Sequence, residues 1–164
     1  MKLLLIIASK HGSTKDIGEV VQKNLSDQNE VEILVPSAVT NLDEYEGVIL
    51  GSAVYMTQWM PEMVDFVNKH RDELFHKPVW AFSVGLSGVP KGNVQDPSRV
   101  GKALVLADPI RHVTFPGRLN SSELTFRERS IARMGGAIEG DFRDWDAVNR
   151  FCEQVSQDIA EMKG

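Results

Sequence analysis

Short apolar runs alternate along this chain with longer stretches of helical periodicity. This alternation is the sequence feature that most limits which folds the chain can adopt. Runs that predict strands occupy residues 3–8, 31–35, 47–51, 78–84 and 112–115. Stretches that predict helices occupy residues 14–26, 61–75 and 97–107, and a last one follows an N-cap at Asp144. Strands separated by helices imply right-handed βαβ crossovers and hence a parallel sheet. The sequence therefore predicts an α/β fold, a three-layer sandwich in which helices cover both faces of a five-stranded parallel sheet.

The 164 residues fit a single domain spanning residues 1–164. One segment, residues 117–141, does not follow the alternation of strand and helix. It contains a charged helical piece at 125–134 that is closed by two glycines, Gly135 and Gly136. We interpret it as an insertion or irregular segment after the fifth strand.

Several classes of protein are disfavoured by the composition. The N-terminal apolar run is only six residues long and lacks a small-residue cleavage site, so a buried strand fits better than a signal peptide. No run approaches the roughly 18 apolar residues of a transmembrane segment, which leaves only a peripheral membrane contact open. The single cysteine, Cys152, excludes an internal disulfide and favours a reducing, cytoplasmic location. The histidines lack ligand spacing, so we expect no metal site.

Charge is unevenly distributed along the chain. The net charge is −5, which argues against general nucleic-acid binding. Between Arg99 and Arg133, however, seven basic and three acidic residues give +4, and the remainder carries −9. A solvated surface would explain this distribution, and so would a site that receives an anionic substrate.

Three loops should meet where ligands bind in an open α/β sheet, beyond the carboxyl ends of the strands. They are residues 9–14, 52–59 and 84–93. The first reads Ser-Lys-His-Gly-Ser-Thr and joins a buried strand to an amphipathic helix, so hydroxyls, Gly12 and helix amides can surround a phosphate. It is neither a nucleotide-triphosphate loop nor a dinucleotide Gly-x-Gly-x-x-Gly motif. The alternative is that Ser and Thr serve there only as local helix caps.

The first loop resembles that of the flavodoxins, whose FMN-phosphate loop reads Ser/Thr-x-Thr-Gly-x-Thr. Ser9, Gly12 and Thr14 match, whereas His11 replaces a small hydroxyl residue. Residues 51–56 look like the family's Gly-Ser/Ala-x-x-Tyr loop beside the flavin ring, and residues 83–88 occupy the place of the other ring loop without its stacking aromatic residue. The resemblance implies FMN and a flavodoxin-like sheet of order 2-1-3-4-5. It implies cofactor contacts from Ser9, Lys10, His11, Gly12, Ser13, Thr14, Ala53, Val54, Tyr55, Met56, Ser83, Val84, Gly85, Leu86 and Ser87.

Two aromatic residues of the second loop, Tyr55 and Trp59, are candidates to flank the flavin ring; the alternative is a partly buried loop residue, which is favoured for Trp59. No Ser-His-Asp set or carboxylate pair stands out, so catalytic residues stay unassigned. Cys152 lies on the apolar stripe of the last helix and is interpreted as a core thiol.

The C-terminal third resembles a subgroup, the flavodoxin-like protoporphyrinogen oxidases that pass electrons to quinone. The shared features are a basic helical segment that ends in Met-x-Gly-Gly and the pattern Asp-Trp-x-x-Val-x-x-Phe at 144–151. Three functions remain: an FMN oxidoreductase with a small substrate, an electron carrier between partner proteins, and a binding module without cofactor. Carrier flavodoxins are strongly acidic, so the +4 stretch favours the oxidoreductase. Arg118, Arg127 and Arg129 are then expected to receive an anionic substrate without affecting flavin binding.

Overall fold

The computed structural model describes residues 1–55, 58–85, 101–134 and 136–164. Five parallel strands form the main sheet in the order β2-β1-β3-β5-β6. This order confirms the predicted order 2-1-3-4-5 of the parallel strands. A short strand that the sequence did not predict, β4, pairs antiparallel with the end of β3. The strand bounds are β1 Lys2–Ala8, β2 Glu30–Leu34, β3 Gly47–Tyr55, β4 Gln58–Trp59, β5 Val79–Gly85 and β6 Arg111–Pro116.

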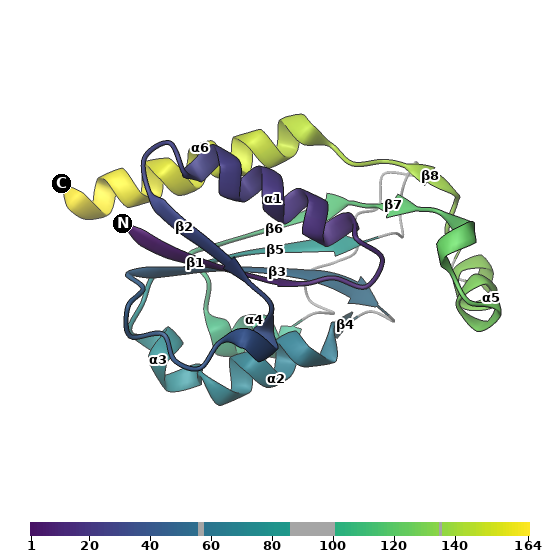
Figure 1. The fold of residues 1–164 in the computed structure, drawn as a ribbon, viewed down its shortest axis with the longest axis horizontal. Coiled ribbons are helices and arrows are strands. Elements are labelled where there is room, and N and C mark those ends of the chain that lie inside the picture. The colour runs from purple at the N-terminus through teal and green to yellow at the C-terminus, as the bar shows by residue number, and fades with distance from the viewer. Residues whose placement is uncertain (56–57, 86–100, 135) are drawn as a thin grey trace.

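Helices cover both faces of the sheet, as Figure 1 shows. Helices α1 (Ser13–Leu25) and α6 (Trp145–Lys163) lie on one face, and α2 (Pro61–Lys69), α3 (Arg71–Phe75) and α4 (Gly101–Ala107) lie on the other. A 3-10 turn, η1 (Pro36–Ala38), follows β2. Strand β1 serves both cores because its side chains alternate. Leu3 and Leu5 pack under α1 and α6, whereas Leu4 and Ile6 pack with the opposite layer.

One predicted helix is divided in the structure, and the predicted start of another is confirmed. The stretch 61–75 was predicted as one helix, but His70 interrupts it with φ −102° and ψ 18° and separates α2 from α3. The ring of His70 is buried and packs on Phe66, which ties the break to the core. The last helix begins as predicted, since the Asp144 carboxylate accepts a hydrogen bond from the amide of Ala147.

The segment between β6 and α6 lies beyond the carboxyl end of the sheet (Figure 1). Strands β7 (Arg118–Leu119) and β8 (Gly140–Asp141) pair antiparallel in a separate two-stranded sheet. Between them come a 3-10 turn, η3 (Ser121–Glu123), and helix α5 (Phe126–Met134). The predicted charged helical piece at 125–134 therefore corresponds to α5, outside the main sheet. No helix in the described part of the chain is long and apolar enough to cross a membrane.

Candidate functional site

A hollow at the carboxyl edge of the sheet brings together residues from four parts of the chain. They come from the β1–α1 loop, the ends of β3 and β5, and strand β7. The lining residues are Lys10, His11, Ser13, Thr14, Ala53, Val54, Tyr55, Val84 and Arg118. Eight of these nine residues belong to the set predicted from the sequence, and Arg118 does not.

The other predicted residues lie beside the hollow or elsewhere. Ser9 and Gly12 belong to the loop that forms one wall, and the carbonyl of Gly85 accepts a hydrogen bond from Gly117. Ser83 is buried and its hydroxyl does not line the hollow. Met56, Leu86 and Ser87 lie outside the described residues.

The loop at residues 9–14 leaves the start of α1 without a side-chain cap. Gly12 occupies the N-cap position with φ 85°, a conformation that glycine adopts at little cost. Its amide donates to the hydroxyl of Ser9 at 3.2 Å, and no side chain in the described structure caps the first turn. Ser13 and Thr14 are buried at this turn, but neither acts as a helix cap. The local-cap explanation is therefore wrong, and the free helix amides can bind an anion.

Helix α5 contacts this loop through one carboxylate. Glu128 pairs with the ammonium of Lys10 at 2.9 Å and lies 3.7 Å from Nε2 of His11. The backbone amide of Thr125 and the Lys10 ammonium both donate to the Glu128 carboxylate, and they lower its pKa to about 2. The Lys10 ammonium also lies 3.5 Å from the centre of the Tyr55 ring. Residues far apart in sequence are thus joined directly beside the hollow.

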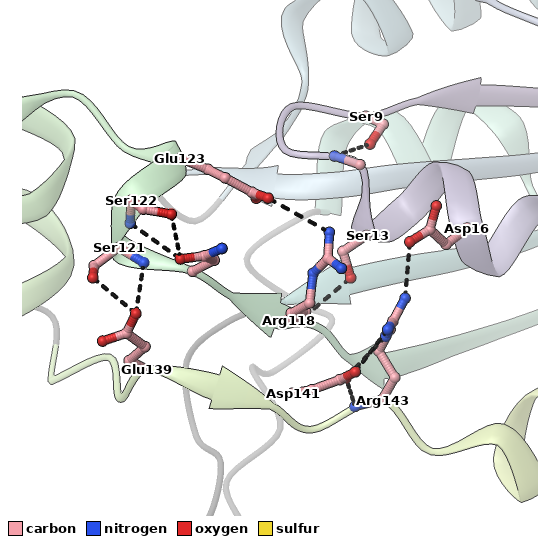
Figure 2. Close-up of polar contacts among 12 residues, drawn as sticks. Ser9, Ser13, Asp16, Arg118, Ser121, Ser122, Glu123, Glu139, Asp141 and Arg143 are labelled. Atoms are coloured by element: carbon pink, nitrogen blue, oxygen red, sulfur yellow. Dashed lines mark hydrogen bonds and ion pairs between the residues drawn. The ribbon is translucent and has the colours of Figure 1, made fainter.

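Arg118 is the residue of the hollow that sequence reasoning misplaced. Its backbone amide donates to the hydroxyl of Ser13 at 3.1 Å, and Figure 2 shows its side chain beside the start of α1. The terminal nitrogen Nη2 lies 4.0 Å from the point that a Cβ on Gly12 would occupy. Arg118 therefore lies at the predicted phosphate loop, and the expectation that it acts apart from that loop is not supported. Its sequence signals are its place in the +4 stretch and its position shortly after the fifth strand, and neither indicates a contact with residues 9–14.

Trp59 is not a surface aromatic of the hollow. Its indole is buried, and Nε1 donates to the hydroxyl of Ser83 at 2.8 Å. That hydroxyl lies 2.8 Å from Nε2 of His112, whose pKa is lowered by burial. The neutral imidazole can accept a hydrogen bond from Ser83, so the three side chains form a buried polar chain. Tyr55 is consequently the aromatic residue that the described structure offers at the hollow.

Two further expectations concern reactive or ligating groups. Cys152 is buried in the core, and burial raises the pKa of its thiol to about 11, as expected for an unreactive core cysteine. Within the described ranges, no three His, Cys, Asp or Glu residues are grouped so that they could hold a metal ion.

Comparison with solved structures shows the same fold in flavodoxins. A flavodoxin of Streptococcus pneumoniae TIGR4 superposes with a TM-score of 0.61 and 16% identity, over 96% of this chain and 99% of that chain. A cysteine-to-serine mutant of a flavodoxin from Pseudomonas aeruginosa superposes with a TM-score of 0.54 and 17% identity, over 82% of this chain and 93% of that chain.

Two sequence comparisons agree with the structural ones. A protein of Leishmania major named protoporphyrinogen IX dehydrogenase [quinone] is 28% identical over 172 residues, which cover 94% of this chain and 74% of that protein. The model of the flavodoxin domain matches residues 4–146. With that match over most of its length, this chain belongs to the flavodoxin domain family and takes FMN as its cofactor.

Proposed function

We propose that this protein is an FMN-dependent oxidoreductase of the protoporphyrinogen-oxidase type, which takes hydrogen from a small anionic substrate and passes electrons to an acceptor such as quinone. Bound FMN supplies the redox chemistry, and the chain supplies binding and orientation. The observation that carries the proposal is the contact between α5, which has basic and apolar exposed side chains, and the loop at residues 9–14. In this proposal residues 1–164 form one FMN-binding domain with residues 117–141 as its insertion.

The loop at residues 9–14 would hold the FMN phosphate. Its support is the uncapped start of α1, where backbone amides and the dipole of the helix favour an anion. Ala53, Val54 and Tyr55 would lie along the flavin ring, with Val84 beside Ala53 on the neighbouring strand. The full proposed set also keeps Ser9, Gly12, Met56, Ser83, Gly85, Leu86 and Ser87 from the sequence prediction.

A porphyrinogen substrate combines carboxylates with a large apolar ring system, and α5 exposes side chains for both. Arg127, Arg129 and Arg133 are exposed on this helix, and guanidinium groups pair well with carboxylates. Phe126 is 85% exposed and Met134 83% exposed. Large apolar side chains that stay in water are typical of binding surfaces. The name of the Leishmania major relative agrees with this chemistry.

The second candidate is an electron carrier that is recognised only by partner proteins. The flavodoxins with similar structures favour it. The mild net charge of −5 argues against it, since strong acidity steers carriers to basic partners. For either candidate we propose a cytoplasmic location, supported by the single, buried Cys152.

Anaerobic reduction of the FMN-loaded protein by protoporphyrinogen IX tests the proposal. We expect the flavin absorbance to bleach with this substrate and to return on addition of a quinone. A protein that the porphyrinogen never reduces, but that exchanges electrons readily with a flavodoxin reductase, would be a carrier.

A further inference from the structure

The charged groups around the hollow are mostly paired with one another. Lys10 is committed to Glu128 at 2.9 Å. On the other side of the loop, Arg143 pairs with Asp16 at 2.9 Å and with Asp141 at 2.6 Å, as Figure 2 shows. Among the described residues that line the hollow, Arg118 is therefore the positively charged residue without a carboxylate within hydrogen-bond distance.

Arg118 has only a distant carboxylate nearby. Its Nη2 lies 3.9 Å from Oε1 of Glu123, which is beyond hydrogen-bond distance. The Glu123 side chain is 41% exposed, and ion pairs at the surface contribute little. The Nε of Arg118 is buried and has no hydrogen-bond partner within the described structure. The guanidinium therefore lacks a close acceptor among the described residues, and an unpaired donor of this kind is costly.

The backbone at this corner fixes Arg118 against the loop. Besides the contact of the Arg118 amide with Ser13, the amide of Gly117 donates to the carbonyl of Gly85 at 2.9 Å. The amide of Phe142 donates to the carbonyl of Gly117 at 3.1 Å. A Cβ on Gly117 would lie 3.1 Å from Val84 and 3.2 Å from the hydroxyl of Ser13, so a larger residue would push these neighbours away by a few tenths of an ångström. These hydrogen bonds fix the backbone from which the Arg118 side chain extends.

We propose that Arg118 binds the phosphate of FMN directly and makes the protein select FMN over riboflavin. This inference rests on the proposed position of the phosphate at residues 9–14. A phosphate there would accept hydrogen bonds from the terminal nitrogens, for which the described residues offer no acceptor within hydrogen-bond distance, and a guanidinium matches phosphate oxygens with paired donors. The cofactor site then takes one ligand from the segment after β6, in addition to the loop that the sequence indicates.

The test compares the affinities of two flavins in matched variants. Dissociation constants for FMN and riboflavin are measured by flavin fluorescence in wild type, Arg118→Met, Arg118→Lys and Arg150→Met. Arg150 is exposed on α6, outside the hollow, so its replacement makes the same change in net charge. We expect Arg118→Met to weaken FMN about tenfold or more, with riboflavin changed less than about twofold. Arg118→Lys should retain part of the FMN affinity, and Arg150→Met should leave both affinities unchanged.

Salt dependence and phosphorus NMR give readouts that a structural role would not move. In Arg118→Met the FMN affinity should depend less on salt, and the phosphorus resonance of bound FMN should shift. Equal losses for both flavins, or no loss for either, would overturn the inference. If Thr14→Ala lowers the preference for FMN and Arg118→Met does not, the phosphate loop stands and only the role of Arg118 fails. The porphyrinogen assay tests the oxidoreductase proposal separately from all of these measurements.

Discussion

Replacing Glu128 should detach helix α5 from the loop at residues 9–14. One oxygen of its carboxylate accepts a hydrogen bond from the amide of Thr125 at 2.9 Å, and the Thr125 hydroxyl accepts from the Glu128 amide at 3.3 Å. This reciprocal pair is a capping box at the start of α5. The other oxygen pairs with the Lys10 ammonium at 2.9 Å. A single side chain thus stabilises the helix and anchors it to the loop.

The two contributions can be separated by choosing the substitution. Glutamine can keep the capping box but loses the charge, so Glu128→Gln should cost about 0.5–1 kcal/mol, the upper range for a surface pair. That upper range applies because the Lys10 side chain is only 27% exposed and that of Glu128 only 15%. Alanine also removes the hydrogen bond that the Thr125 amide donates to the Glu128 carboxylate, which contributes about 1 kcal/mol, so Glu128→Ala should cost roughly 1.5–2 kcal/mol.

Urea unfolding of Glu128→Gln, Lys10→Met and the double variant measures the interaction directly. The cycle should give a coupling free energy of about 0.5–1 kcal/mol at neutral pH. Because the folded-state pKa of Glu128, about 2, lies below its ordinary value of 4.5, this stabilisation should be complete above pH 4.5 and should fade as the pH falls toward 2. A coupling below about 0.2 kcal/mol at neutral pH would refute the anchoring role. Equal losses in the glutamine and alanine variants would instead refute the capping role of the Glu128 side chain.

Three further predictions concern the cofactor and the substrate. Thr14→Ala should weaken FMN by roughly 1–3 kcal/mol, measured by fluorescence titration, because the phosphate would lose a donor; a loss of a few tenths would place the hydroxyl elsewhere. Tyr55→Ala should brighten bound flavin and shift its redox potentials, since a stacked ring quenches and tunes flavin; unchanged emission and potentials would place Tyr55 away from the ring. Replacing Arg127, Arg129 and Arg133 together by glutamine should raise KM for protoporphyrinogen with little change in FMN affinity or stability, whereas an unchanged KM would contradict a substrate role for α5.

Local patterns in the sequence were sufficient for the strands and helices, whereas the resemblance to flavodoxins supplied the strand order and most of the residues that line the hollow. A strand that is covered on both faces of a sheet is apolar at every position, so a short continuous apolar run predicts it. A helix that packs on the sheet by one face shows an apolar stripe with helical spacing. The loop at residues 9–14 was recognisable because its glycine, its hydroxyls and the start of its helix are adjacent in sequence. The pattern around Trp59 left two alternatives open, because an aromatic residue in a loop has the same local pattern whether it faces a ligand or, as here, donates to a buried Ser83.

Arg118 and Glu128 show why the rest of the site was not predictable. Each contacts the loop at residues 9–14 although more than a hundred residues separate them in the sequence, and no local spacing specifies such a contact. The charge count had detected the basic segment but could not say which arginine turns toward the loop. Backbone hydrogen bonds of Gly117 and Arg118 decide that, and they exist only once β5 and α1 are in place. The segment that carries the proposed substrate surface is thereby tied at two points to the proposed phosphate loop. FMN binding and the order of α5 should consequently stabilise each other.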